Sequence, residues 1–480
     1  MREHRAARAA ALLATALAVT LVGTGCTVVG QAAEAGAETV VVGYQSKTIN
    51  TVTAGTLLRA QGYFEKRLAE LGRGTGKRYA VTWQDYDTGA PITAQMIAGK
   101  IDIGSMGDYP LLINAARGQQ DPRTRTKFVA VTGYNLRGAL NSIVVAPDSP
   151  VRTLRDLSGR IVSTSVGSAG HGLLVQAARA AGLDPTKDFR TENQQPQVGA
   201  SALRSGAVAA LSQFVAWPGL LVHSGEARML YDGGALGVPT LHGVVVREAF
   251  AKERPEVLAA FLRAQLDATA FLHESPLAAA KIVAEETGLP VEVVYLYNGP
   301  NGVATFDATL KEPLREALAQ DIPFLKSVGV LQEADLAAFV DDGPLRAVYG
   351  PEYERDAAST ANPAAITGAD PVCGRPVTDP ARASELWLTG VETTQPAATP
   401  TCLLRAVKAA GGKVRAAYVP DAVTGTRWFA DRSVWVRDPA AAGHERYQPF
   451  TTAATAEEYV RAHPGATVVS YAEALADVAP

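Results

Sequence analysis

The spacing of apolar and polar positions predicts alternating short strands and amphipathic helices from about residue 39 to residue 350. In Asp85–Arg117 (DYDTGAPITAQMIAGKIDIGSMGDYPLLINAAR) a strand ends, a helix follows from Thr88, a buried strand occupies Ile101–Gly104, and a second helix opens at Pro110. Two successive strands therefore each lead into a helix N-terminus. In open α/β sheets this arrangement binds small molecules, because free backbone N–H groups point into the crevice.

The same pattern continues on both sides of this stretch. A third small-residue turn, Ser165–His171 (SVGSAGH), leads into a helix expected at Gly172–Ala181, and a long amphipathic helix is expected at Thr53–Glu70. Further strands are expected at Thr39–Gly43, Tyr79–Trp83, Phe128–Tyr134, Ala139–Ala146, Val208–Phe214 and Pro239–Val246. The regular alternation of strands and helices predicts the α/β fold class.

The tail of the chain has a pattern of its own. Residues 354–369 are rich in Ala, Ser, Thr and Pro, a composition typical of a linker. Within residues 370–480, strands are expected at Leu386–Val391, Lys413–Val419, Thr426–Phe429, Val434–Arg437, Tyr447–Thr451 and Thr467–Ser470, and helices at Thr401–Ala410 and Ala456–Ala462. This mixture predicts a small α+β domain, and we expect its removal to leave small-molecule binding by the preceding residues nearly unchanged.

Residues 1–26 have the pattern of a secretory signal peptide. Three arginines precede the apolar run Ala9–Val22, and small residues then lead to Cys26. The segment resembles a lipoprotein signal, which implies lipidation of Cys26. A plain signal peptide and an uncleaved anchor are the alternatives, although the apolar run is short for a spanning helix. Residues 27–38 are expected to form a tether.

Charge and composition exclude several function classes. The net charge is −3, so there is no electrostatic case for nucleic-acid binding. The sequence contains no metalloprotease, α/β-hydrolase or P-loop motif, and its seven histidines show no metal-ligand spacing. We therefore expect no catalytic centre, no metal and no cofactor. With Cys26 lipidated, Cys373 and Cys402 remain as an even pair in an oxidising compartment, which predicts a disulfide.

Two motifs carry a family resemblance. GKIDIGSMGDYP (residues 99–110) and GYFEKRLAEL (residues 62–71) resemble segments of the solute-binding proteins of nitrate-, sulfonate- and taurine-type ABC importers. The resemblance extends over about residues 39–350 and implies a two-lobed, type II periplasmic-binding-protein clamp. Lobe I would comprise residues 39–138 and 247–353, and lobe II residues 139–246. In such a clamp the ligand lies in the cleft, and hinge closure adds contacts from the second lobe.

The resemblance also implies which residues face the ligand. They follow strands or begin helices, and they are Gln45, Ser46, Thr88, Gly89, Gly107, Asp108, Tyr109, Asn141, Ser142, Ser168, Gly170, His171 and Trp217. Asp108 has two interpretations, an N-cap of the helix at Tyr109–Pro110 or a carboxylate that meets a cationic group of the ligand. His171 is either a ligand contact or an ordinary first-turn residue. Trp217 either stacks on the ligand or packs under its turn.

The tail distantly resembles the NosL-type copper lipoproteins. Its ending, PFTTAATAEEYVRAHPGATVVSYAEA (residues 449–474), is similar to theirs, and Cys373 stands at the position of their opening cysteine. Arg375, however, replaces the methionine of the family pattern, and a disulfide would consume both thiols. Because Cu(I) prefers thiolate and thioether ligands, we expect the fold to be kept and the metal site to be lost. His444 and His463 are the imidazoles of the tail.

The function that accommodates these features is that of a lipid-anchored, extracytoplasmic solute-binding component of an ABC importer, without enzymatic activity. Its partners would be a small polar or anionic solute, a permease, an ATPase and, through the lipid, the membrane. The alternatives are a metal-handling or sensor lipoprotein that acts through its C-terminal domain, and an enzyme on the same clamp fold. Three helix N-termini favour an anion or a zwitterion such as a sulfonate, whereas Asp108 disfavours nitrate.

Overall fold

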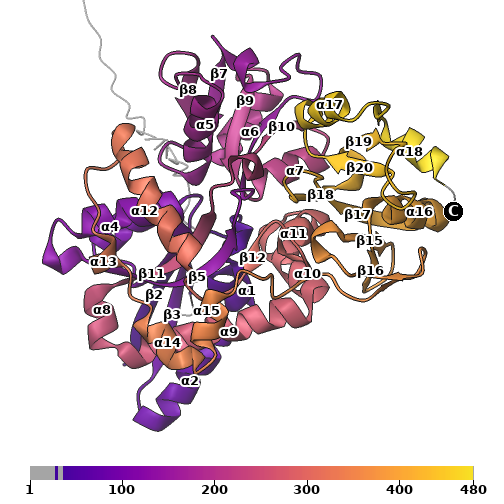
Figure 1. The fold of residues 1–480 in the computed structure, drawn as a ribbon. Helices are drawn as coiled ribbons and strands as arrows, with labels where there is room; N and C mark the ends of the chain where they lie inside the picture. The colour runs from indigo at the N-terminus through magenta and orange to yellow at the C-terminus, as the bar shows by residue number, and fades with distance from the viewer. Residues whose placement is uncertain (1–27, 31–35, 479–480) are drawn as a thin grey trace, which may run out of the picture.

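The structure is a computed structural model that describes residues 28–30 and 36–478, which form two α/β lobes and a C-terminal α+β domain (Figure 1). The expected signal peptide, Cys26 and most of the expected tether lie outside the described residues. Val28–Gly30, expected to be part of the tether, instead forms strand β1, which pairs antiparallel with β3. Within the described ranges, no helix combines the length and the apolar character needed to cross a bilayer.

Lobe I contains a seven-stranded sheet in the order β1-β3-β2-β4-β11-β5-β12. β2 runs parallel to β3 and β4, whereas β11 lies antiparallel between β4 and β5. The strands are β1 (Val28–Gly30), β2 (Glu38–Tyr44), β3 (Tyr79–Asp85), β4 (Ile103–Gly107), β5 (Thr126–Asn135), β11 (Thr240–Arg247) and β12 (Thr305–Phe306). The insertion of β11, a strand from later in the chain, gives the type II order that the family resemblance implies.

Helices pack around the lobe I sheet (Figure 1). The main ones are the 3-10 helix η1 (Ile49–Ala54) and the α-helices α1 (Thr56–Ala60), α2 (Tyr63–Thr75), α3 (Gly89–Ile97), α4 (Asp108–Gly118), α8 (Glu248–Glu253), α9 (Pro255–Glu274), α10 (Pro276–Thr287), α11 (Val291–Asn298), α12 (Glu312–Ser327), α13 (Leu336–Phe339), α14 (Gly343–Tyr349) and α15 (Tyr353–Ala358). The prediction of a single helix at Thr53–Glu70 is wrong, because this range contains the end of η1, all of α1 and the start of α2. Gly62 adopts a left-handed φ of 61°, which separates α1 from α2. α15 occupies the first residues of the expected linker.

Lobe II contains a five-stranded sheet in the order β10-β6-β9-β7-β8. Its strands are β6 (Asn141–Val145), β7 (Ile161–Thr164), β8 (Arg190–Asn193), β9 (Ala210–Phe214) and β10 (Arg228–Asp232), and its helices are α5 (Ala169–Ala180), α6 (Pro196–Arg204) and α7 (Trp217–His223). β7 runs parallel to β8 and β9, and β6 lies antiparallel between β9 and β10. Lobe II therefore repeats the strand order of lobe I, and the predicted two-lobed α/β clamp is confirmed.

The chain crosses between the lobes twice, from β5 to β6 and from β10 to β11. β11 lies wholly in the lobe I sheet, so lobe II ends near Asp232 and the boundary expected at residue 246 is wrong. The two crossing segments are in close contact, because a Cβ on Gly233 would lie 2.4 Å from the carbonyl oxygen of Gly138. A side chain at residue 233 would force the two segments apart.

In its described residues, the C-terminal domain combines three small sheets with three α-helices. Its strands are β13 (Ala369–Asp370), β14 (Arg375–Pro376), β15 (Ser384–Leu388), β16 (Thr394–Ala397), β17 (Val414–Pro420), β18 (Arg427–Phe429), β19 (Val434–Arg437), β20 (Tyr447–Phe450) and β21 (Thr467–Val469), and its helices are α16 (Pro400–Ala410), α17 (Ala453–Ala462) and α18 (Tyr471–Asp477). A disulfide joins Cys373 to Cys402, with 5.9 Å between their Cα atoms. The predicted α+β class holds, although β13, β14, β16 and α18 have no counterpart among the expected elements.

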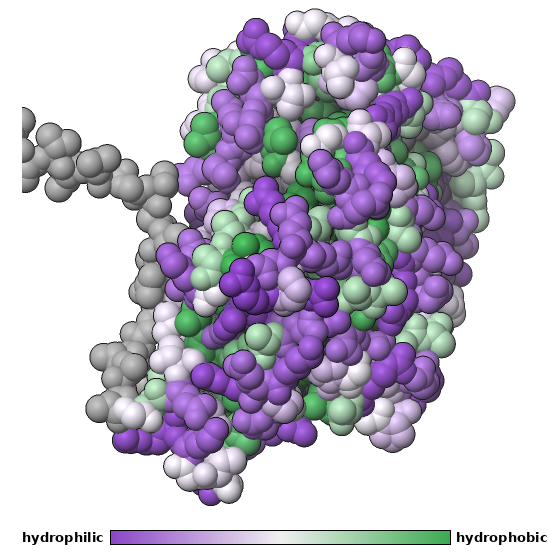
Figure 2. All heavy atoms as spheres, turned by 90° about the vertical axis from the view of Figure 1, so that its left-hand side faces the viewer, coloured by the Kyte–Doolittle hydropathy of each residue, from purple (hydrophilic) through white to green (hydrophobic). Residues whose placement is uncertain are grey.

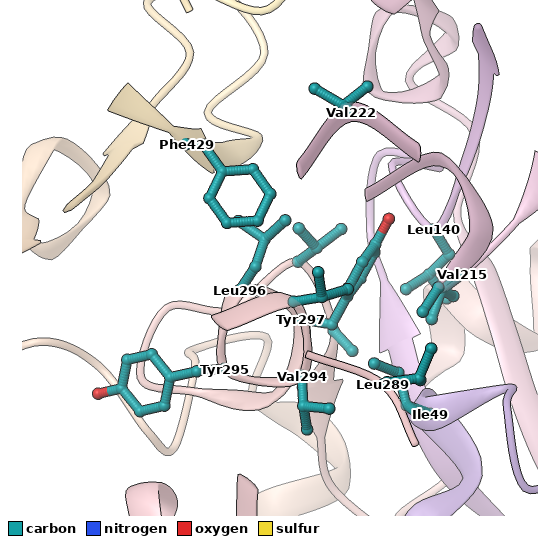
Figure 3. Close-up of a cluster of buried hydrophobic side chains, with 14 of the residues drawn as sticks. Ile49, Leu140, Val215, Val222, Leu289, Val294, Tyr295, Leu296, Tyr297 and Phe429 are labelled. Carbon is teal, nitrogen blue, oxygen red and sulfur yellow. The ribbon is translucent and has the colours of Figure 1, made fainter. Parts of the chain in front are cut away.

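The hydrophobic core of the clamp continues into the C-terminal domain. Residues of both lobes, of α11 and of the C-terminal domain form one buried cluster, part of which Figure 3 shows. Its aromatic members from the C-terminal domain are Trp387, Tyr418, Trp428 and Phe429. Removal of this domain would expose Tyr295 and Leu296 of α11, which are fully buried. The expectation that removing the tail leaves small-molecule binding nearly unchanged stays a prediction, but the packing shows that the clamp would lose part of its buried core.

The surface on the left-hand side of Figure 1 is mostly hydrophilic, with hydrophobic side chains scattered between the hydrophilic ones (Figure 2). Among the described residues, the large hydrophobic side chains that are exposed are all valines, at positions 166, 198, 372, 391, 423 and 468. They are distributed over lobe II and the C-terminal domain. Val166 differs from the others in that it lines the cleft between the lobes.

Candidate functional site

A cavity of about 170 Å³ lies between the two lobes. Lobe I contributes Gln45, Thr88, Gly89, Ala90, Gly107, Pro110 and His242 to its wall. Lobe II contributes Ser165, Val166, Gly167, Ser168, Ala169, Asn193, Gln195 and Phe214. Five of the predicted ligand contacts thus meet at one cavity, namely Gln45, Thr88, Gly89, Gly107 and Ser168.

Four helices begin at this cavity. The N-cap residues are Thr88 for α3, Gly107 for α4, Ser168 for α5 and Gln195 for α6, and all four line the wall. The hydroxyl of Ser168 accepts a hydrogen bond from the backbone N–H of His171, whereas Thr88 makes no such side-chain bond. The first N–H groups of a helix have no partner within the helix, and the dipole places partial positive charge there. The cavity is therefore suited to an anionic group.

His242 of β11 adds a neutral side chain to this wall. Its Nδ1 lies 2.7 Å from Nδ2 of Asn50, which also donates to the carbonyl oxygen of Gly133. With Nδ1 accepting from the amide, the proton of the imidazole is on Nε2. Nε2 would lie 3.0 Å from a Cβ on Gly107, at the N-terminus of α4. Burial lowers the pKa of His242 to about 3, so the ring offers one N–H donor and no charge.

The polar side chains of the cavity are all uncharged. Gln45 donates from Nε2 to the carbonyl oxygen of Ser105, and Gln213 donates to the hydroxyl of Ser165 from behind the wall. The side-chain oxygen of Asn193 accepts from the N–H of Val166. These bonds hold the wall in place, and none of the lining residues is an acid, a lysine or an arginine. An anion would therefore be held by dipoles and N–H groups rather than by an ion pair.

Asp108 faces away from this cavity, contrary to the ligand-facing interpretation. α4 begins at Asp108 itself with Gly107 as its N-cap, so the predicted N-cap is one residue too late. The carboxylate accepts from the N–H of Tyr109 at 2.8 Å and from the N–H of Leu241 at 3.2 Å. With Asp321 of α12 it lines a separate small cavity. Burial raises the pKa of Asp108 to about 6, and burial followed by the charge of Asp108 raises that of Asp321.

Tyr109 joins the lobes instead of lining the main cavity. Its ring packs on Gly172 of α5, where a Cβ would lie 1.8 Å from the ring. Its hydroxyl accepts a hydrogen bond of 2.6 Å from Nε2 of Gln176, also in α5. Asn141, another predicted contact, lines the same small cavity as Asp108. These three residues thus lie beside the cleft cavity, not in its wall.

The remaining predicted contacts are outside the wall of the main cavity. Ser46 donates to Asp85, and Ser142 lies within β6. A Cβ on Gly170 would lie 2.8 Å from the Cα of Gln213, so this glycine packs α5 against β9.

His171 accepts from the N–H of Gly167, and burial lowers its pKa. Trp217 is half-buried at the start of α7, with Nζ of Lys47 6.0 Å from its ring centre. Contact of any of these residues with a ligand stays a prediction.

Sequence reasoning missed His242, Ser165, Asn193, Gln195 and Phe214. The signal for His242 was present, since it interrupts the apolar strand PTLHGVVV at residues 239–246. The other four come from three separate strand ends and loops of lobe II. Only the folded sheet brings those ends to one edge.

The tail cysteines are near a carboxylate. Asp370, Cys373 and Cys402 place potential ligand atoms within 4.8 Å of one another. The disulfide occupies both sulfur atoms, and Asp370 accepts hydrogen bonds from the N–H groups of Val372, Cys373 and Ala398. In the oxidised protein this group is a structural crosslink with a capping carboxylate. The resemblance of the tail to the copper lipoproteins stays a prediction.

Comparisons with known proteins agree with the clamp. Residues 92–279 match the family model described as NMT1/THI5 like. A putative aliphatic sulfonates-binding protein of Escherichia coli strain K12 is 27% identical over 266 residues, which are 55% of this chain and 77% of that protein. The taurine-binding periplasmic protein of the same organism is 28% identical over 191 residues, which are 39% of this chain and 56% of that protein.

Among solved structures, the fold is similar to that of the alkanesulfonate-binding protein SsuA from Xanthomonas axonopodis pv. citri bound to MOPS. The TM-score is 0.54 with 23% sequence identity, and the match covers 65% of this chain and 99% of that chain. The resemblance to solute-binding proteins and the clamp fold are thereby confirmed.

Proposed function

We propose that this chain, a relative of the sulfonate- and taurine-binding proteins, is an extracytoplasmic solute-binding component of an ABC importer that captures an organic sulfonate. The observation that carries the proposal is the uncharged cleft cavity at which α3, α4, α5 and α6 begin. Their N–H groups and Nε2 of His242 would hold the sulfonate oxygens. The two lobes would close on the ligand and deliver it to a membrane permease.

The uncharged wall of the cavity also predicts an order of affinity among candidate solutes. A simple alkanesulfonate brings one anionic group and an apolar tail, which Val166, Pro110 and Phe214 can accommodate. Taurine adds an ammonium group that would lose water without gaining a carboxylate partner, because Asp108 faces away. We expect ethanesulfonate to bind about tenfold or more tightly than taurine, since unpaired burial of a charge is costly. Isothermal titration calorimetry with ethanesulfonate, butanesulfonate, taurine and nitrate tests this order.

A matched pair of variants tests the role of His242. His242→Phe keeps a ring of similar shape but removes the N–H, and it should weaken ethanesulfonate binding by about 1.5–3 kcal/mol, the value of a hydrogen bond to a charged group. His273→Phe, in α9 and outside the cleft cavity, is the control and should leave the affinity unchanged. Equal affinity for both variants, or no binding of any sulfonate by the parent protein, would contradict the proposal.

Lipid anchoring at Cys26 belongs to the same proposal. The residue lies outside the described ranges, and the support comes from the lipoprotein-like pattern of residues 1–26. Cys26→Ser should release the protein to the medium or leave it unprocessed. Membrane association and maturation equal to those of the parent chain would contradict lipidation. Recovery of ethanesulfonate unchanged after incubation with the protein would distinguish binding from catalysis.

A further inference from the structure

The C-terminal domain contacts both lobes of the clamp. Figure 1 shows it beside α10 and α11 and beside α7 and β10. On the α11 side, Tyr418 donates a 3.0 Å hydrogen bond to the carbonyl oxygen of Glu292, and Arg415 forms an ion pair with the carboxylate of that residue. The rings of Tyr295 and Tyr418 are 5.6 Å apart. α11 in turn packs on α10 and on η1 of lobe I, which anchors this side of the interface to lobe I, and it also packs on α7 of lobe II.

On the lobe II side, the domain holds the buried carboxylate of Asp232. The hydroxyl of Thr424 donates to it at 2.6 Å, and the hydroxyl of Thr451, which lies 2.9 Å from the carboxylate of Asp421, is 3.4 Å from the same Asp232 oxygen. Asp421 orders these donors by accepting from the backbone N–H groups of Thr424 and Thr451. All four residues are buried, with at most 7% of their surface exposed. The ring of Phe429 is 5.2 Å from that of His223 at the end of α7, which adds an apolar contact beside this network.

Asp232 is the last residue of β10, where the chain leaves lobe II for lobe I. Its second carboxylate oxygen accepts from the N–H of Gly234, and Gly234 lies so close to Thr426 that a Cβ would be 2.8 Å from the threonine hydroxyl. The C-terminal domain therefore contacts the segment that crosses from lobe II to lobe I. In a two-lobed clamp the crossing segments are where backbone rotation opens and closes the cleft.

The lobes touch across the cleft in the same structure. The ring of Tyr109 in lobe I packs against Gly172 in lobe II, and its hydroxyl accepts a hydrogen bond from Gln176. Arg179 of α5 donates a hydrogen bond to the hydroxyl of Ser327 in α12. The contacts of the C-terminal domain are thus made while the lobes are together. A rotation of lobe II away from α11 and the C-terminal domain, which share a hydrophobic core, would have to break the hydrogen bond from Thr424 to Asp232.

We propose that the function of the C-terminal domain is that of a brace, which holds the two lobes in the closed arrangement by binding lobe I through α11 and the crossing segment through Asp232. The closed arrangement is then populated without ligand. A binding-competent state that is already populated raises the apparent affinity and slows the loss of ligand, because less of the binding free energy is spent on closure. The effect on affinity rests on the proposed function, whereas the effect on lobe distance does not.

The test separates the brace from a domain that is merely attached to lobe I. Thr424→Val combined with Thr451→Val removes both hydroxyls at nearly constant volume. Asp232→Ala removes the carboxylate from the lobe II side, together with the bond that it accepts from Gly234. Thr455→Val is the matched control, since this hydroxyl bonds within the C-terminal domain, to Thr452. Melting curves confirm that each variant is folded.

Lobe distances are measured by double electron–electron resonance in the full chain carrying Cys26→Ser. Spin labels are placed through Arg117→Cys in lobe I and Val198→Cys in lobe II, both exposed positions. Without ligand, the parent protein and Thr455→Val should show one short distance, and both brace variants should add a longer one. Identical distributions in all proteins, or a parent protein that is already open without ligand, would overturn the brace.

Ethanesulfonate titrations then measure the consequence for binding. The brace variants should bind it about threefold to tenfold more weakly than Thr455→Val, the scale of one lost hydrogen bond. An opened variant with unchanged affinity would overturn the coupling between brace and cleft. If the parent protein binds no sulfonate while the brace variants still open, the brace stands and the proposed solute is wrong.

Discussion

Glu385→Gln should destabilise the protein strongly, because it would leave a buried arginine without a counter-charge. Glu385 and Arg427 pair at 2.5 Å with side chains that are 5% and 4% exposed. The carboxylate also accepts from the hydroxyl of Thr394 at 2.7 Å, and the hydroxyl of Tyr295 lies 3.3 Å from it. The pair therefore sits at the junction of β15, β18 and α11, where the C-terminal domain meets the clamp.

The magnitude follows from the burial of the arginine. Removing one partner of a buried ion pair costs about 3–5 kcal/mol, most of it the penalty of the remaining charge. Arg427 keeps its bond to the carbonyl oxygen of Pro300 and its position over the ring of Tyr418, 4.6 Å from the ring centre. Glutamine also retains an acceptor oxygen. We therefore expect a loss of about 3 kcal/mol, the lower end of the range.

Urea unfolding followed by tryptophan fluorescence measures this loss of stability, since Trp387 and Trp428 lie in the core that the clamp and the C-terminal domain share. Glu226→Gln is the matched control, because its pair with Arg204 is 36% and 46% exposed and should be worth less than about 1 kcal/mol. Replacing both Glu385 and Arg427 by apolar residues should recover most of the loss. The reasoning is refuted if Glu385→Gln costs no more than Glu226→Gln.

Three further outcomes are expected. Burial raises the pKa of Asp108 from 3.8 to about 6, so the folded protein binds that proton more tightly than the unfolded chain does. The free energy of unfolding should therefore fall by about 3 kcal/mol as the pH rises from about 4 to about 6. If the difference in unfolding free energy between wild type and Asp108→Asn does not change over this range, the prediction is contradicted. Asp108→Asn should leave the affinity for ethanesulfonate unchanged. A loss of affinity of tenfold or more would show that the carboxylate acts on the ligand after all. Alkylation and intact-mass measurement should find no free thiol at Cys373 or Cys402, and reduction should destabilise the C-terminal domain by roughly 3–4 kcal/mol, the loop-entropy value for a separation of 29 residues; two alkylated thiols in the unreduced protein would exclude the disulfide.

Affinity should also be insensitive to pH between about pH 5 and about pH 8. The wall of the cleft cavity contains one titratable side chain, His242, whose pKa of about 3 keeps it neutral over this range. A bell-shaped or sigmoidal profile of ethanesulfonate affinity, measured by calorimetry, would show that another titrating group reaches the ligand. His242→Phe separates the two cases, because a profile that persists in this variant does not come from the imidazole.

The local pattern of the sequence determined the elements and their order. Strand periodicity and turn residues located β3, β4, β5 and β9 within a few residues, and the small-residue turns marked the starts of α3, α4 and α5. These features depend on neighbouring residues, because helix N-termini and strand alternation are properties of short segments. The presence of a cavity lined by helix N-termini at the ends of the strands was accessible for the same reason.

The tertiary structure decided which side chains reach the cleft and what the C-terminal domain touches. The sequence shows Asp108 at a helix start, but only the neighbouring strand β11, 133 residues later, supplies the N–H of Leu241 that turns its carboxylate away. The same strand brings His242 to Gly107. Likewise, apolar periodicity shows that a face of α11 is buried, but not that Trp387 and Tyr418 cover it. Hydrophobic burial has no direction, so a pattern reports that a face leaves water without naming its partner.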